Sequence, residues 1–411
     1  MNNKLLRLLA VLFALAMVAA SCGDDSSDTS ADTDTGTGTD VSADTGTTDA
    51  TQGGDGSQEE GAQDDGSGSA AGCESLDEVS LQLQWVAQSQ FAGYYAAVDQ
   101  GFYEDFCLDV TIVEGGVDIV PQQQLGSGAV DYAIAWVPKA LVSRAEGIDI
   151  VNVAQVYQRS GTLQVSFADA GIESPADFAG RKVGNWGFGN EFELLAGSRA
   201  NGVEPGVDYE LIQQNFDMTA LISGEIDAAQ AMIYNEYAQV LETVNQETGE
   251  LYQPEDLTVI DWNDVGTAML QDAVWASGER LADADYQDQT TRFIAGSIQG
   301  WAWCRDNVEA CVDVVLDNGT TLGVSHQTWQ LNEVNGLVWP SPGGAGVMDK
   351  ALWDQTIEIS VSEDVLAEAP DDSAFTTEYA EAALALLADK DIDVTGSDWT
   401  RIEVELLPGG E

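Results

Sequence analysis

The 411-residue sequence is poor in positive charge: 14 Lys and Arg residues stand against 71 Asp and Glu residues, a formal net charge of −57. Such a chain lacks the basic surface that holds nucleic acid or an anionic membrane. It has one histidine, His326, and neither a C-x-x-C pair nor a G-x-S-x-G sequence. Neither a zinc site nor a serine-hydrolase triad is indicated. We expect no metal and no cofactor.

Long apolar runs are also absent, and the N-terminal run over residues 8–20 has only thirteen residues. A helix that spans a bilayer needs about 20. Lys4 and Arg7 precede the run, which is typical of a secretory signal peptide, here over 1–22. The run ends in Ala19-Ala20-Ser21-Cys22, which resembles a bacterial lipobox and implies lipidation of Cys22. The alternative is an ordinary cleaved signal near an unpaired cysteine.

Residues 23–72 contain thirteen acidic residues, no basic residue and no aromatic residue. Gly, Ser, Thr, Asp, Ala and Gln make up most of the segment, so it cannot bury enough apolar surface to fold. We predict a disordered acidic linker with a reach of about 40 Å. The globular part then spans 73–411 and carries a net charge of −46. That excess suggests a saline habitat, where salt screens the repulsion.

Four further cysteines follow, an even number in a chain predicted to be exported: Cys73, Cys107, Cys304 and Cys311. Two disulfides are the default, with three possible connectivities and buried free thiols as the alternative. We favour Cys73–Cys107, which brackets one β-α-β unit, and the local pair Cys304–Cys311. Residues seven apart on a helix are separated by about 10.5 Å, whereas a disulfide needs Cα atoms within about 7 Å. Asp306-Asn307 should therefore break the helix and cap a new one.

Short apolar runs alternate with amphipathic stretches after residue 73, which predicts an α/β fold with mainly parallel sheets. Strands are expected at 79–86, 109–113, 131–135 and 150–157, with helices at 91–100, 121–127 and 137–146. A second set has strands at 182–184, 209–213 and 228–231, and helices at 174–178, 191–200, 219–223 and 235–242. Helices at 287–304, 308–316, 326–334, 347–366 and 376–390 follow. The two sets suggest two lobes, 73–165 with 262–411 and 166–261.

Five segments resemble a known family in their order and spacing. They are WVAQSQFAGYYAA at 85–97 with Gly101-Phe102-Tyr103, EGG at 114–116, LGSGAVDY at 125–132, IESPADFAGRKVG at 172–184 and LISGEIDA at 221–228. They are similar to periplasmic solute-binding proteins of ABC importers, in the branch that binds nitrate, sulfonates, riboflavin or the thiamine pyrimidine precursor. The resemblance implies a two-lobed type 2 periplasmic-binding-protein fold with a cleft between lobes. It also implies a monomeric, lipid-anchored extracytoplasmic protein that delivers a solute to an ABC permease with its ATPase.

Residues just after strand ends should line that cleft, because ligands of open α/β sheets bind at the carboxyl ends of the strands. The candidates are Trp85, Gln88, Tyr94, Trp136, Tyr157, Trp186, Phe188, Asn190, Tyr234, Asn235 and Glu236. The aromatic side chains suit a flat heterocycle, such as a thiamine pyrimidine precursor or riboflavin, although core packing also explains a single ring. Lys139 is the one basic residue nearby, so nitrate or an alkanesulfonate is the second choice.

Two candidates have specific alternatives. Glu236 is expected to accept hydrogen bonds from an aminopyrimidine or a flavin, or else to be a solvated helix residue. The turn at 184–191 opens a helix and offers backbone N–H groups to an anion, or is only a Gly-rich turn. Fungal members of the superfamily are enzymes that consume a histidine of their own and a bound pyridoxal phosphate. His326 lies in the helical remainder and nothing beside Lys139 binds phosphate, so we expect no enzyme.

Overall fold

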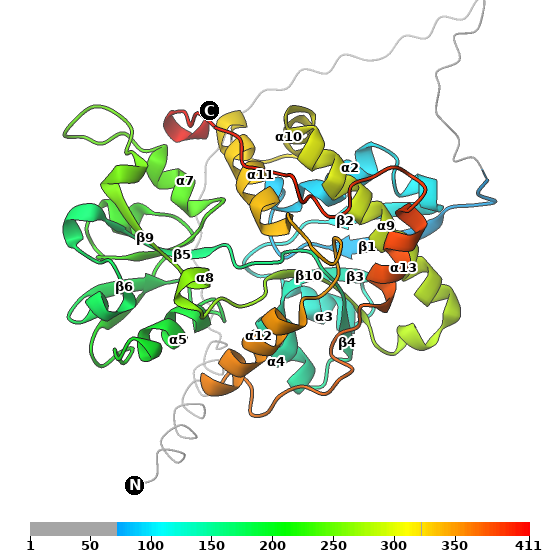
Figure 1. The fold of residues 1–411 in the computed structure, drawn as a ribbon, viewed down its shortest axis with the longest axis horizontal. Helices are drawn as coiled ribbons and strands as arrows, with labels where there is room; N and C mark the ends of the chain where they lie inside the picture. The colour runs from blue at the N-terminus through cyan, green and yellow to red at the C-terminus, as the bar shows by residue number, and fades with distance from the viewer. Residues whose placement is uncertain (1–71, 322) are drawn as a thin grey trace, which may run out of the picture. The chain divides into compact units, whose positions relative to one another are not determined.

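The computed structural model describes residues 72–321 and 323–411, in which three sheets form the framework (Figure 1). The first sheet has the strand order β2-β1-β3-β10-β4. Its strands are β1 (Asp77–Gln82), β2 (Leu108–Val113), β3 (Tyr132–Trp136), β4 (Ile150–Gln155) and β10 (Asp272–Ser277). β1 pairs in parallel with β2 and β3, and β10 runs antiparallel to β3 and β4. Four strands therefore point the same way and β10 opposes them.

The second group of strands consists of two smaller sheets, β8-β5-β9 and β6-β7. Its strands are β5 (Thr162–Phe167), β6 (Lys182–Asn185), β7 (Glu210–Gln213), β8 (Ala229–Met232) and β9 (Leu257–Asp261). β6 pairs in parallel with β7, and a parallel bridge joins Val183 to Ala228 beside β8. β5 is antiparallel to both β8 and β9. The predicted α/β class with mostly parallel strands is confirmed.

The chain passes between the first sheet and the second group twice, through residues 156–161 and 262–271. The first passage leads into β5 and the second into β10. Each of these strands runs antiparallel to its neighbours in its own sheet. A parallel neighbour needs a long crossover, whereas a strand entered from another sheet is free to run the other way. Sequence analysis did not predict β5, β9 or β10, although β5 alternates polar and apolar residues with the period of a strand. The predicted boundary between residues 165 and 166 falls inside β5.

Helices cover both faces of the first sheet. Side chains of β3 alternate between two apolar cores, with Tyr132 and Ile134 in one and Ala133 and Ala135 in the other. The helices around this sheet are α2 (Ala92–Asp99), α3 (Pro121–Gly126), α4 (Val137–Ala145), α9 (Ala284–Asp306), α10 (Val308–Asp317), α11 (Val324–Val338), α12 (Lys350–Ser362) and α13 (Glu378–Leu387). The second group carries α5 (Phe192–Ala200), α6 (Thr219–Ile222), α7 (Glu236–Leu241) and α8 (Trp262–Val265). The helix predicted at 174–178 is a 3-10 turn, Pro175–Phe178.

The two central helices of the first core, α2 and α9, approach closely because glycine replaces larger side chains at their contact. A Cβ atom on Gly300 would collide with the backbone oxygen of Gly93, and one on Gly93 would enter the ring of Trp301. The side chain of Asp283 accepts a hydrogen bond from the backbone N–H of Asp285 and so caps the start of α9. This packing fixes α2, and with it the turn that follows β1.

Both favoured disulfides are present, Cys73–Cys107 and Cys304–Cys311, with Cα atoms 5.6 Å and 5.1 Å apart. The predicted helix break is confirmed, because α9 ends at Asp306 and α10 begins at Val308. Asn307 donates its side-chain amide to the carbonyl of Trp303, so it caps the end of α9 rather than the start of α10.

The N-terminal predictions fall outside the part of the chain that the structure describes. This applies to the signal peptide over 1–22, to lipidation of Cys22 and to the linker up to residue 71. Among residues 72–321 and 323–411, no helix combines the length and the apolar character needed to cross a membrane.

Candidate ligand-binding site

A cavity of about 550 Å³ lies between the first sheet and the second group. Its walls come from the turns that follow β1, β3, β6, β7 and β8, at the carboxyl ends of those strands. The volume lies within the range of about 300–1,000 Å³ that is typical of small-molecule sites. This is the place at which open α/β sheets bind their ligands.

Nine of the eleven predicted residues line this cavity. They are Trp85, Gln88, Trp136, Trp186, Phe188, Asn190, Tyr234, Asn235 and Glu236. Tyr94 and Tyr157 do not line it. Tyr94 is on the inner face of α2 and packs edge-on against Trp301, with ring centroids 5.7 Å apart. Tyr157 is fully buried and donates its hydroxyl to the backbone carbonyl of Gln90.

Sequence analysis missed other residues of the walls. Gln84 and Gln90 flank the predicted Gln88, Phe216 follows β7, and Met232 ends β8. The rule that selected the other candidates, proximity to the end of a strand, also applies to Phe216. A loop after β2 closes one side through Val117, Ile119, Val120, Pro121 and Gln122. Val117, Ile119 and Val120 are exposed aliphatic residues, and their clustering in one short segment is a signal that the sequence analysis did not use.

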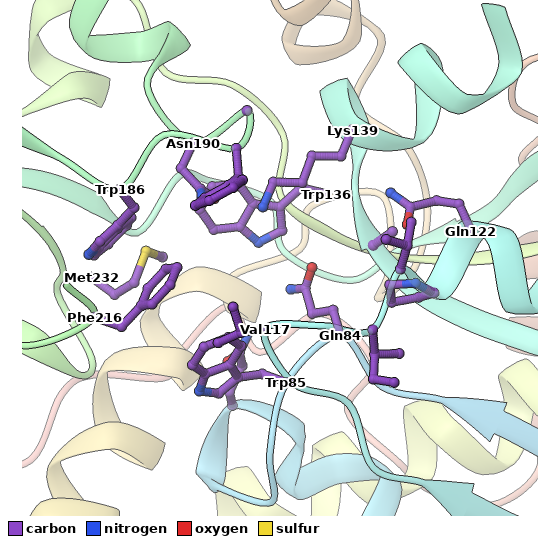
Figure 2. A pocket seen from close by; sticks show the side chains of 18 of the residues that line it. Gln84, Trp85, Val117, Gln122, Trp136, Lys139, Trp186, Asn190, Phe216 and Met232 are labelled. Atoms are coloured by element: carbon purple, nitrogen blue, oxygen red, sulfur yellow. The ribbon is translucent and has the colours of Figure 1, made fainter. Parts of the chain in front are cut away.

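Aromatic side chains from both sides of the cavity meet. Figure 2 shows Trp85, Trp136, Trp186 and Phe216 around a common space. Phe216 stacks on Trp186 with ring centroids 5.8 Å apart, and it contacts Trp85 at 5.1 Å with tilted planes. Trp85 belongs to the first sheet and Phe216 to the second group, so this contact joins the two walls. These separations are those at which aromatic rings attract one another.

The turn after β6 is strained and its ring is exposed. Gly187, Phe188 and Gly189 have φ angles of 70°, 56° and 84°, and Phe188 keeps 73% of its surface exposed. Positive φ is costly for a residue with a Cβ atom, so the glycines on either side suit this turn. The backbone N–H groups of Trp186, Gly187, Gly189 and Asn190 all donate to protein acceptors. These four N–H groups are therefore not available to an anion.

A buried carboxylate organises the amides of the cavity floor. Asp272, the first residue of β10, accepts hydrogen bonds from the side-chain amides of Gln84 at 2.5 Å and Gln90 at 2.9 Å. The side-chain oxygen of Gln90 accepts in turn from the amide of Gln88 at 2.7 Å. Burial raises the pKa of Asp272 to about 6, against the effect of these donors. Ionised Asp272 only accepts, so it turns the amide nitrogen of Gln84 inward and leaves its oxygen toward the cavity.

Glu236 is held by the protein itself. Its two carboxylate oxygens accept from the backbone N–H of Met232 and from the side-chain amide of Asn235, both at 2.9 Å. Burial raises the pKa of Glu236 above its ordinary value. The carboxylate is buried and lines the cavity, so Glu236 is not a solvated helix residue.

The single histidine extends this network away from the cavity. His326 of α11 is fully buried; its Nε2 lies 3.0 Å from the side-chain oxygen of Asn235 and its Nδ1 lies 2.8 Å from Glu242. Because Asn235 donates to Glu236, its oxygen accepts from His326 Nε2–H. Nδ1 faces the carboxylate of Glu242. The histidine is used to join α7 to α11, and it does not line the cavity.

Residues 88–310 match a family model described as NMT1/THI5 like. The chain belongs to this family. The match runs from the turn after β1 into α10 and so includes the second group and most of the cavity walls. The resemblance seen in the sequence is confirmed.

Three relatives show what this family contains. The chain is 26% identical over 249 residues to the formylaminopyrimidine-binding protein of Halalkalibacterium halodurans, covering 60% of this chain and 72% of that one. It is 24% identical over 322 residues to the riboflavin-binding protein RibY of Chloroflexus aurantiacus, covering 74% and 86%. A 4-amino-5-hydroxymethyl-2-methylpyrimidine phosphate synthase of Saccharomyces cerevisiae is 24% identical over 156 residues, covering 38% and 46%. The two binding proteins match over most of their length and the synthase over less than half.

A solved structure has the same fold. It is the ligand-binding component of an ABC-type import system from Staphylococcus aureus, with a TM-score of 0.55 and 12% identity. The likeness covers 75% of this chain and 99% of that one. The predicted periplasmic-binding-protein fold is therefore confirmed.

Proposed function

We propose that this protein binds a small, neutral aromatic heterocycle in the cavity and delivers it to an ABC permease. The observation that carries the proposal is the cavity at the strand ends, whose aromatic walls come from both the first sheet and the second group. Tryptophan and phenylalanine rings at these separations suit a flat ligand, and the glutamine and asparagine amides suit its polar edge. A thiamine pyrimidine precursor or a riboflavin-like molecule has this form.

We propose that the first sheet and the second group, which are joined by the passages 156–161 and 262–271, are two lobes that close over the ligand. The two passages between them would be the hinge. Gln271 of one passage joins the other: its side-chain oxygen accepts from the N–H of Gly161, and its amide donates to Ser160 and Thr162. A ligand that contacts both walls favours the closed state by its differential affinity, which is how the permease would sense it.

The synthase alternative has less support from this chain's own residues. The fungal chemistry consumes a histidine, and His326 is buried outside the cavity walls with Asn235 and Glu242 beside its ring nitrogens. Lys139 is the single basic residue among the residues that line the cavity, so a phosphate there would meet one cation. Nitrate or an alkanesulfonate would meet the same shortage of positive charge.

We further propose an extracytoplasmic location, with the binding domain attached to the cell membrane through lipidated Cys22 and the linker over 23–72. The two disulfides suit an oxidising compartment outside the cytoplasm. Labelling of expressing cells with a radioactive fatty acid, with Cys22→Ala as the control, tests the anchor. Equal labelling of both proteins would contradict it.

The ligand is tested by mass spectrometry of small molecules that co-purify with the full chain. Titration with 4-amino-5-hydroxymethyl-2-methylpyrimidine, its formylaminomethyl analogue, riboflavin, nitrate and alkanesulfonates follows, read by calorimetry. We expect tight binding of a heterocycle. Tight binding of an alkanesulfonate with no heterocycle bound would contradict the ligand class, and turnover with pyridoxal phosphate and iron would revive the enzyme.

A further inference from the structure

One cavity residue is a cation without an acceptor. Lys139 is in the first turn of α4, three residues after the end of β3, and its Nζ lies 4.8 Å from the centroid of the Trp136 ring. Figure 2 shows the side chain running over Trp136 into the space that Asn190 borders. Its aliphatic part packs against the turn after β6, where a Cβ on Gly189 would lie 3.5 Å from Cγ of Lys139. The lysine therefore comes from one wall and is covered by the other.

The ammonium group can donate three hydrogen bonds, yet within residues 72–321 and 323–411 it donates none. Lys350 and Lys390, in contrast, have carboxylate oxygens at 2.6 Å and 2.9 Å. Acidic residues are abundant, but none in the described part of the chain is placed to accept from Lys139. Such a partly buried donor gains most from an acceptor that the ligand brings.

The two acidic side chains whose charges act on Lys139 already accept hydrogen bonds from other groups. Glu191 accepts from the backbone N–H of Gly189, and Asp272 accepts from Gln84 and Gln90. Their fields oppose, but do not outweigh, the burial that lowers the pKa of Lys139 to about 8. Lys139 thus remains mostly protonated at neutral pH.

The charge around Lys139 indicates the kind of acceptor. Among the residues that line the cavity, Lys139 is the single base and Glu236 the single acid, and Asp272 lies directly below the floor. An anionic ligand would gain one cation and face two acidic groups, whereas a neutral carbonyl oxygen gains the cation at less cost. Resting on the proposed function, we propose that Lys139 donates to a carbonyl oxygen of the ligand and so selects, among flat heterocycles, those that carry one.

The test compares two neutral ligands that differ at this point: the N-formyl derivative of 4-amino-5-aminomethyl-2-methylpyrimidine, which has a carbonyl, and 4-amino-5-hydroxymethyl-2-methylpyrimidine, which has none. The wild-type protein should bind the formyl compound about 10- to 100-fold more tightly. Lys139→Met should reduce that ratio to near one, and Lys139→Arg should keep part of it. Lys182→Met, which removes an exposed lysine outside the cavity, should leave the ratio unchanged.

An unchanged ratio in Lys139→Met would overturn the inference while leaving the proposed function intact. Absence of binding by every heterocycle would instead contradict the proposed function. A purely structural role for Lys139 beside Asp272 would lower the affinity for both ligands equally, which the ratio detects.

A second measurement observes Lys139 directly and does not rely on a ratio of affinities. The lysines are labelled by reductive ¹³C methylation, and the Lys139 signal is assigned as the one that Lys139→Arg lacks. Saturation with whichever heterocycle binds, riboflavin included, should shift that signal and raise the pH at which it titrates. A signal that stays in place with a carbonyl-bearing ligand bound would overturn the inference.

Discussion

The carboxylate of Glu193, in α5, accepts a hydrogen bond from the backbone N–H of Met269 at 2.5 Å and another from the hydroxyl of Ser160 at 3.1 Å. Ser160 and Met269 belong to the two different passages between the first sheet and the second group. One buried side chain thus holds both passages where we propose the hinge. Because an acidic group is a costly choice for so buried a place, its titration should be visible in the stability of the protein.

Glu193→Gln should change how the free energy of unfolding depends on pH. Burial raises the pKa of Glu193 from 4.5 to about 8. The folded state therefore keeps a proton that the unfolded state releases above about pH 4.5, so the stability that this group provides is full below that pH and is lost as pH rises to about 8. In the wild type this decline in the free energy of unfolding amounts to a few kcal/mol, and the variant should lose it. Urea unfolding at pH 5, 6.5 and 8 measures the difference.

Glu225→Gln is the matched control, because Glu225 is exposed. Asp272 also has a raised pKa, so it too makes the free energy of unfolding decline as pH rises, by a smaller amount. This decline is present in both the wild type and the Glu193 variant, and it cancels in the comparison. Parallel stability curves for the wild type and Glu193→Gln would contradict the assignment.

Phe216→Ala should weaken ligand binding and leave the fold intact. The ring contacts Trp85 across the cavity and Trp186 on its own side, so its removal separates the two aromatic walls. Two ring contacts correspond to roughly a 10- to 100-fold loss of affinity, measured by calorimetry. Phe167→Ala is the control, because its ring pairs with Tyr252 outside the cavity. Equal losses in both variants would mean that the cavity is not the binding site.

The sequence predicted most of the cavity lining from one rule, that residues just after the strand ends face the ligand. The ends of β1, β3, β6 and β8 each precede an aromatic or amide residue, and those residues converge because parallel strands finish at the same edge. The rule fails for Tyr94, because counting from a strand end does not tell which face of α2 a residue occupies. It fails for Tyr157 because the chain there passes toward the second group and turns its ring into the core.

Glu242→Ala should destabilise the protein by about 3–5 kcal/mol, because it leaves the buried imidazole of His326 without its carboxylate partner. His326→Ala should cost a similar amount for the converse reason. The double variant should cost much less than the sum, since neither buried group then remains without its partner. Urea unfolding of the four proteins gives the coupling energy.

The exposed pair of Lys350 and Asp354 provides the comparison, and Asp354→Asn should have only a small effect. Additive effects of the two buried substitutions would show that the His326–Glu242 contact is not energetically coupled. Such coupling is expected only from the tertiary structure, because 84 residues separate the partners.

The sequence also could not predict the polar floor of the cavity, because the residues that form it are far apart in the chain. Asp272 begins β10, a strand that the sequence analysis did not find, and it meets Gln84 from a turn 188 residues earlier. An aspartate between Gln271 and Ala273 gives no sign in the sequence that it will be buried. The pairing of Asp272 with two glutamine amides depends on β10 entering the sheet in reverse between β3 and β4.

The excess of acidic residues predicts that salt stabilises this protein. Residues 73–411 carry a net charge of −46, and folding brings these charges together, whereas the unfolded chain keeps them further apart. The Debye length falls from about 30 Å at 10 mM salt to about 3 Å at 1 M, so the repulsion that opposes folding is screened. The free energy of unfolding should therefore rise with NaCl, and by the same amount with choline chloride, because screening does not require a particular cation. A flat or falling dependence would show that this charge does not limit stability, and a rise with sodium alone would indicate a specific cation site instead.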